Sequence, residues 1–188
     1  MVPSRLGSCS TRTAHPYFLH QFEAAVAALG MNHRTLNPFM FSTKGEMLQT
    51  SRNAAFLQSL APMTISCSHP DAGRWQGLPY ANCGYCIPCL IRRAAMHSVG
   101  LDDPADYSFD PLTDSSLHSG TSDRGRDART AATLVSRGGS DLRILANGPL
   151  PEGVDLVAIG DVFKNGVHEM GKLLDDRSAS SVRKLLWN

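Results

Sequence analysis

Four of the five cysteines in this 188-residue chain lie in one short window, with the spacing of a metal site. Cys67 is followed, after 15 intervening residues, by three cysteines separated by two residues each: Cys83, Cys86 and Cys89. Zinc favours four tetrahedral ligands, and cysteines paired on a tight turn supply thiolates at about 2.3 Å from the ion. We therefore expect one structural Zn²⁺ per chain, held by all four thiolates with no coordination position left open for chemistry. Gly84 suits the sharp turn, and Cys9 is the spare cysteine.

Other interpretations of these cysteines stay open. An iron–sulfur cluster is the main rival, because three cysteines at two-residue spacing also begin the bacterial ferredoxin pattern, although no further cysteine follows Cys89. His69 is an alternative to Cys67 as the fourth ligand. A redox cysteine pair and a set of reduced core cysteines are the remaining alternatives. Zinc with four cysteines is favoured, because buried thiols do not normally stack two overlapping pairs on one turn.

Helices are expected on both sides of the cysteines. Apolar side chains recur at helical spacing from His15 to Gly30, where the glycine favours an end. The sequence Thr43-Lys44-Gly45-Glu46 has the pattern of a capping box and predicts a helix that continues to about Leu60. Another helix should follow the cysteines up to Gly100, with Arg92 and Arg93 off its apolar stripe; that stripe consists of Ile87, Leu90, Ile91 and Ala94.

The second half of the chain divides into a polar segment and a helical one. Residues 108–129 are rich in Ser, Asp, Gly and Arg and carry few large apolar side chains, so we expect a mobile segment. Residues 130–188 are predicted to form a helical extension, in which Asp161 caps a helix with one apolar stripe: Phe163, Val167, Met170 and Leu174. Residues 1–107 then form the domain that carries the zinc site.

Composition excludes several classes of protein. The 18 basic residues balance 17 acidic ones, so the net charge of +1 gives no field that would attract nucleic acid. No apolar run approaches the roughly 20 residues that a membrane-spanning helix needs. The N-terminal residues lack the apolar stretch of a signal peptide, which favours a cytoplasmic location.

The residues around the cysteines carry a family resemblance. Ser66 precedes Cys67, Arg92 follows the CGYCIPC run, and Gly100 precedes a D-P-A-D-Y sequence that ends at Tyr107. With the threonine–lysine–x–glutamate helix start at Thr43, this pattern resembles the C-terminal zinc region of the 7-cyano-7-deazaguanine synthase (QueC) family. The resemblance covers about residues 7–107, and residues 10–18 look most like the QueC-like proteins of Qat-type anti-phage systems.

The resemblance implies a fold and an activity for the whole protein. The family fold is α/β, of the Rossmann-like ATP pyrophosphatase type, whereas this chain itself should be mainly α with a four-cysteine zinc knuckle. Such enzymes are ATP-dependent ligases of queuosine biosynthesis: they activate the carboxylate of 7-carboxy-7-deazaguanine and use ammonia to form an amide and then a nitrile. The QueC-like defence proteins are thought to attach a deazaguanine to a partner protein instead.

The resemblance also implies residues that bind the substrate or nucleotide: Arg12, His15, Lys44, Glu46 and Arg92. Each has a structural alternative. The capping box alone explains Glu46, and Arg12 and His15 precede a helix N-terminus, where they either bind an anion or belong to a solvated loop. Arg92 is expected to reach the zinc thiolates, with a phosphate as the alternative.

The family's phosphate-binding loop, serine–glycine–glycine–x–aspartate–serine, is not found ahead of the cysteines. The sequence Gly138-Gly139-Ser140-Asp141 matches its middle, but Arg137 and Leu142 replace the two serines and the order is wrong, so we interpret it as a turn. ATP and Mg²⁺ are therefore expected only together with an N-terminal ATP-binding segment or partner protein. Whether this chain is itself an enzyme stays open.

Two other functions compete with the deazaguanine assignment. One is a non-catalytic, zinc-stabilised scaffold that binds a partner protein. The other is a nucleic-acid-binding zinc module, which the balanced charge argues against.

Overall fold

The chain is helical in the part that a computed structural model describes, residues 15–119, 122–138 and 149–187. These residues contain one isolated β-bridge, between Asn82 and Tyr107, and no sheet. The expectation that the chain itself is mainly α is confirmed, whereas nothing in the described part forms the α/β sheet of the family fold. None of the described helices has the length and apolar character needed to cross a membrane.

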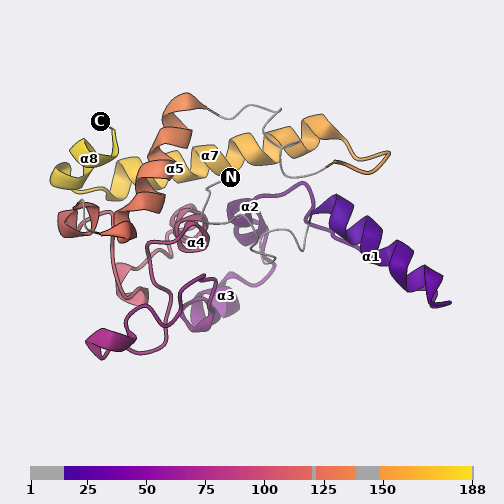
Figure 1. Ribbon diagram of the computed structural model, residues 1–188, viewed down its shortest axis with the longest axis horizontal. Helices are drawn as coiled ribbons and strands as arrows, with labels where there is room; N and C mark the ends of the chain where they lie inside the picture. The colour runs from indigo at the N-terminus through magenta and orange to yellow at the C-terminus, as the bar shows by residue number, and fades with distance from the viewer. Residues whose placement is uncertain (1–14, 120–121, 139–148, 188) are drawn as a thin grey trace. The chain divides into compact units, whose positions relative to one another are not determined.

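The chain contains two compact units that differ from the three consecutive segments expected from the sequence. Unit 1 consists of residues 1–42 and 139–164, and unit 2 of residues 43–138 and 165–188. Helix α7, Leu156–Arg177, contributes residues to both (Figure 1).

Unit 1 contains helix α1, Pro16–Ala28, as predicted. The side chain of His15 caps it by accepting a hydrogen bond of 3.2 Å from the backbone N–H of Tyr17. Helix α7 begins after Asp155, whose Oδ1 accepts from the backbone N–H groups of Val157 and Ala158. The predicted cap at Asp161 is therefore wrong: Asp155 caps the helix, and Asp161 lies inside it.

Unit 2 opens with the predicted capping box. Thr43 Oγ1 accepts from the backbone N–H of Glu46, and the Glu46 carboxylate accepts from that of Thr43. Helix α2, Lys44–Gln49, is short, and Asn53 caps a separate helix α3, Ala54–Leu60. The single helix to Leu60 that we expected is thus two helices, because the Asn53 side chain starts a new one.

The core of unit 2 is built mainly by side chains of α4, α5, α7 and α8. Helix α4 spans Ile87–His97, α5 spans Arg126–Arg137 and α8 spans Ser180–Leu186; α2 packs against α4, and α5 packs against α4 and α8 (Figure 1). The C-terminal part of α7 also contributes to this core. The buried side chains of this core are Leu90, Ala94, Leu112, Ala128, Ala131, Ala132, Met170, Leu173, Leu174, Val182 and Leu186. Of the stripe predicted on α7, Met170 and Leu174 are buried, whereas Phe163 and Val167 are half-buried.

Short 3₁₀ helices connect the longer ones: Ala61–Met63, Arg74–Gln76, Pro104–Asp106, Ser115–His118 and Asp123–Gly125. The last two lie in the segment 108–129, whose composition suggested poor packing. Pro111 and Leu112 of this segment are nevertheless fully buried, and Leu112 and Ala128 belong to the helical core. The mobility of the segment stays a prediction.

The buried face of α4 also differs from the predicted stripe. Ile91 is 41% exposed, whereas Arg92 and Arg93 are buried. Arg93 is buried because Asp102 and Asp110 meet its guanidinium at 3.2 and 2.6 Å. Burial by itself would lower the pKa of Arg93, but the charges of Asp110 and Asp102 raise it above its ordinary value.

Candidate metal centre

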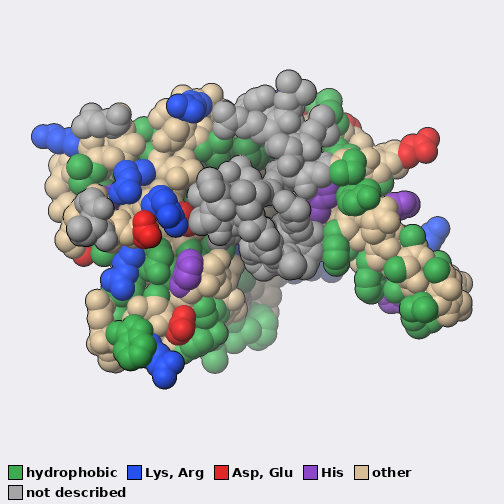
Figure 2. Space-filling view, viewed as in Figure 1, with side chains coloured by type: hydrophobic (Ala, Val, Ile, Leu, Met, Phe, Trp, Pro, Cys, Tyr) green, Lys and Arg blue, Asp and Glu red, His purple; other side chains and the backbone are tan. Residues whose placement is uncertain are grey.

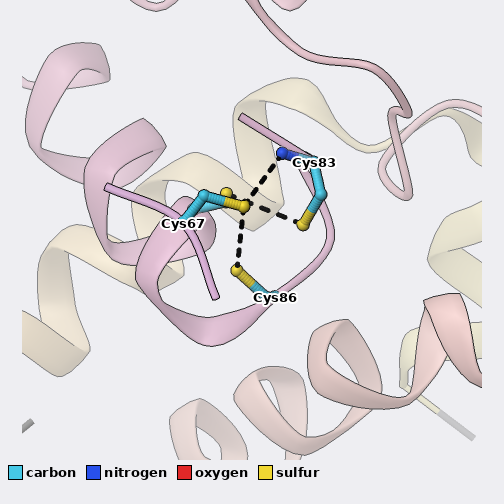
Figure 3. A group of neighbouring side chains, drawn as sticks. Cys67, Cys83 and Cys86 are labelled. Atoms are coloured by element: carbon cyan, nitrogen blue, oxygen red, sulfur yellow. Dashed lines mark hydrogen bonds between the residues drawn. The ribbon is translucent and has the colours of Figure 1, made fainter. Parts of the chain in front are cut away.

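The four predicted cysteines come together in unit 2 from a loop, a turn and a helix. Cys67 lies on the loop after the first 3₁₀ helix, Cys83 and Cys86 lie on a turn, and Cys89 lies in the first turn of α4. The turn requires Gly84, which has φ +86°, a conformation that side chains rarely adopt. In Figure 3 the side chains of Cys67, Cys83 and Cys86 point toward one another.

The distances between the sulfur atoms suit a single metal ion. All four Sγ atoms lie within 4.8 Å of one another, with 3.9 Å between Cys67 and Cys86 and 3.8 Å between Cys83 and Cys89. A tetrahedron of sulfurs about 2.3 Å from a central ion has edges of about 3.8 Å. The two measured separations are far longer than the roughly 2.05 Å of a disulfide bond. The space between the sulfurs therefore suits one metal ion and is small for a cluster of irons and sulfides.

Backbone N–H groups already point at two of the sulfurs. The N–H groups of His69 and Cys83 donate to Cys67 Sγ, both at 3.2 Å, and that of Ser68 donates to Cys86 Sγ at 3.4 Å. Such donors stabilise thiolate charge and fix the orientation of metal ligands. The loop is therefore folded around sulfur atoms as acceptors, which is what metal-bound thiolates require.

Hydrogen bonds between the four thiols shift their pKa values in opposite directions. The hydrogen bond from Cys83 lowers the pKa of Cys67 to about 7, and the one from Cys67 lowers the pKa of Cys86. The corresponding hydrogen bonds with Cys67 raise the pKa values of Cys83 and Cys89. Four thiolates at this separation repel one another, so full deprotonation needs a bound cation.

Buried groups outside the cysteines hold the site in place. Asn82, which is 2% exposed, accepts a hydrogen bond from the N–H of Ser66 and donates to the carbonyl of Thr64, joining the Cys67 loop to the Cys83 turn. Asp127 on α5 accepts from the N–H of Ile87, the first residue of α4. Neither residue was predicted from the sequence to support the site. Only the position of Asn82 directly before Cys83 could have indicated such a role.

Arg92, which was expected to reach the zinc thiolates, forms its hydrogen bonds elsewhere. The Arg92 guanidinium donates to Thr64 Oγ1 and to the carbonyl oxygen of Ala61, not to any sulfur. That expectation is wrong, because the side chain turns toward the 3₁₀ helix that precedes Cys67. The ring of His69 stacks on Tyr85 at 5.7 Å, and His69 is not part of the ligand cluster.

The other predicted site residues are spread over the chain. Arg12 lies outside the described residues, and His15 caps α1 in unit 1. Both carboxylate oxygens of Glu46 are engaged, one by the Thr43 N–H and the other by Asn165 Nδ2 at 2.8 Å. Lys44 and Arg92 line the same cavity in unit 2. Gly138 ends α5, and residues 139–148, with the rest of the glycine–glycine–serine–aspartate sequence, lie outside the described part.

Comparisons of the chain with protein-family models, with curated proteins and with solved structures gave no match. A functional assignment must therefore rest on the site itself and on the motifs around it.

Proposed function

We propose that this chain is a structural zinc protein and forms the C-terminal, zinc-bearing part of a QueC-like protein that processes deazaguanines. The observation that carries the zinc assignment is the set of four cysteine Sγ atoms within 4.8 Å of one another. Four thiolates fill the tetrahedral coordination of Zn²⁺, so the ion stabilises the fold and takes no part in catalysis.

The position of the site supports a structural role. Ligation would join Cys67 to the segment Cys83–Cys89 and so close the loop between them, which buries little apolar surface of its own. Trp75, on that loop, is 91% exposed. A loop without a core must be held at its ends, and the metal does this.

The deazaguanine assignment rests on the motifs. The threonine–lysine–x–glutamate sequence does form a capped helix start, and Lys44 on it shares a cavity with Arg92 from the zinc region. Both are positions at which the resemblance implies a substrate or nucleotide. The ATP-binding loop would come from an N-terminal segment or from a partner protein.

Metal analysis tests the zinc assignment. The purified chain should hold about one zinc ion and should be colourless, because zinc bound by four thiolates has no redox chemistry. A brown protein that contains iron and absorbs visible light would overturn the choice of metal.

A pyrophosphate-release assay tests the enzymatic part of the proposal. Cleavage of ATP between its α and β phosphates needs backbone donors that hold the leaving pyrophosphate. The chain alone, given ATP, Mg²⁺ and 7-carboxy-7-deazaguanine, should release none, and activity should appear when the ATP-binding segment is supplied. Turnover by the chain alone that Asp141→Asn abolishes would identify the Gly138–Asp141 sequence as the true phosphate loop.

A protein-binding scaffold is the second candidate, favoured by the aromatic side chains exposed on the metal-closed loop. Trp75 is 91% and Tyr80 68% exposed. Figure 2 shows hydrophobic side chains at the surface in its lower part, where Figure 1 places α3 and this loop. Exposed apolar patches commonly mark interaction sites. Calorimetry with 7-carboxy-7-deazaguanine in the presence of the ATP-binding segment separates the two functions, because a scaffold binds none.

A further inference from the structure

Unit 2 contains a cavity of about 460 Å³ whose walls are mainly apolar. It lies between α2, α3 and α4, and its apolar lining includes Met47, Leu48, Phe56, Leu57, Leu60 and Met96. Its size is that of a pocket for a small molecule, and such pockets combine apolar walls with a few polar groups. The polar lining contains two cations, Lys44 and Arg92, together with four neutral residues: Ser51, Asn53, Thr64 and Ser66.

Arg92 is buried without a counter-charge. It is only 6% exposed, and its partners are neutral: it donates hydrogen bonds to Thr64 Oγ1 and the Ala61 carbonyl, and it also interacts with the Tyr107 side chain. Its Nε is buried and has no hydrogen-bond partner among the described residues. No described carboxylate forms an ion pair with it. Asp106 senses its charge but does not pair with it.

Arg93, the next residue on α4, is a buried arginine whose charge is balanced by carboxylates. Arg93 is fully buried and meets carboxylates of both Asp102 and Asp110. A buried charge is costly unless it is paired, so proteins normally supply the partner, as this one does for Arg93. For Arg92 the missing partner must come from outside the described protein groups.

Lys44 adds a second cation on the same cavity. Its Nζ lies 3.4 Å from Ser66 Oγ, and it forms no ion pair with any carboxylate in the described part of the chain. Lys44 is exposed to solvent, yet partial desolvation of its ammonium group beside the cavity, followed by repulsion from Arg92, lowers its pKa below the ordinary value. An anion placed between the two would relieve both effects.

We propose that this cavity binds a small organic anion, whose carboxylate or phosphate group lies between Lys44 and Arg92 and whose apolar body contacts Phe56, Leu57 and Met96. The inference deepens the proposed function, because the resemblance implies a substrate or nucleotide at the same Lys44 and Arg92, but it is argued from the cavity and its cations, and its test does not require deazaguanine processing. The charged group supplies the counter-ion that the protein lacks, and the apolar body fills the remaining volume.

Calorimetry with 2-naphthoate, and with its neutral isostere 2-naphthamide, tests the inference on the zinc-loaded full chain. The naphthoate should bind at least about tenfold more tightly, as expected for charge-assisted hydrogen bonds. 2-Naphthyl phosphate forms a third arm: whichever anion binds more tightly identifies the charged group. Amide NMR shifts caused by binding should map to α2, α3 and α4. Equal affinity for the naphthoate and the amide, no binding, or shifts elsewhere would overturn the inference.

The variant Lys44→Met tests the role of the cations. Arg92 also holds Thr64 and Ala61, so Lys44, at the start of α2, is the safer position to change. The variant should reduce the preference for naphthoate over naphthamide by about tenfold, whereas Lys184→Met, an exposed lysine on α8, should keep it. An unchanged preference in Lys44→Met would contradict the proposal. Zinc is measured in every sample, so a failure of anion binding is not confused with a failure of the metal site.

Discussion

Arg92 and Arg93 are adjacent on α4, and both are buried, yet only Arg93 is fully paired with carboxylates. Arg93→Met should lower the free energy of unfolding by about 3–5 kcal/mol, because it breaks a buried ion pair and leaves the buried Asp102 carboxylate with Arg177, at 3.7 Å, as its remaining cation. Its guanidinium also lies 5.1 Å from the ring of Tyr107, so packing is lost as well. Urea denaturation of the zinc-loaded chain measures the change.

Arg126→Met is the matched control for that experiment. Arg126 and Asp123 pair at 3.5 Å with side chains 49% and 86% exposed. Exposed pairs contribute at most about 1 kcal/mol, so this variant should unfold at nearly the same urea concentration as the parent chain. If Arg93→Met is no less stable than Arg126→Met, the buried pair does not hold α4 in place.

The cysteines allow a second comparison at the scale of single residues. Cys86→Ser should lose the metal and destabilise unit 2, because a serine hydroxyl is a poor replacement for a thiolate and loss of a structural metal is among the largest single-site effects. Metal content and thermal unfolding measure this outcome. Cys9→Ser serves as the control and should keep about one zinc per chain. Full zinc content in Cys86→Ser would rule out Cys86 as a ligand.

At the scale of elements, the turn before α4 depends on the backbone of Gly84. A Cβ at Gly84 would overlap with the carbonyl oxygen of Phe109, whereas one at Gly77 would meet nothing within 4 Å. Both glycines have positive φ, at +86° and +71°. Gly77→Ala should therefore cost only about 1–2 kcal/mol of backbone strain. Gly84→Ala should cost clearly more and weaken zinc binding, as competition with a chelator would show; equal costs would mean that Phe109 moves aside freely.

The features that were predicted correctly depend on residues that are close together in the sequence. The capping box of Thr43 and Glu46 forms within four residues, and Cys83, Cys86 and Cys89 lie within seven residues of sequence, so spacing alone identifies both. The buried face of α4 was not predictable in this way. A hydrophobic pattern always predicts that an arginine such as Arg93 is exposed. Its burial depends on Asp102 and Asp110, which contact it from a loop later in the chain.

The cavity and the packing of residues 108–119 could not be predicted from the sequence either, because both depend on contacts between residues that are distant in the sequence. The cavity exists only because α2, α3 and α4 meet, and no single segment contains its pattern of cations and apolar walls. Leu112 is one apolar residue in a polar stretch, but its carbonyl accepts a hydrogen bond of 2.8 Å from the Ala179 N–H at the start of α8. Composition averages over the segment and hides such a contact.

At the scale of the whole unit, hydrogen exchange tests this packing. The amide of Ala179 should be protected, because its acceptor belongs to the fully buried Leu112. The amide of Ser116 in the same segment, whose acceptor is the exposed side chain of Asp114, gives the comparison within one experiment. Exchange of Ala179 as fast as that of Ser116 would support the expectation of a mobile segment.

Metal removal should affect more of unit 2 than the loop that carries the ligands. Cys89 and Leu90 are adjacent and both fully buried, the first among the sulfurs and the second in the helical core. Asp127 also ties α5 to the first turn of α4. Binding free energy at a structural zinc site is folding free energy, of the order of 10 kcal/mol, so a chelator should lower the melting temperature and expose amides of α5 and α8 together with the loop. Added Zn²⁺ should restore both in the parent chain and neither in Cys86→Ser. If α5 and α8 keep their protection while the loop loses it, the metal is a local clamp and the helical core folds without it.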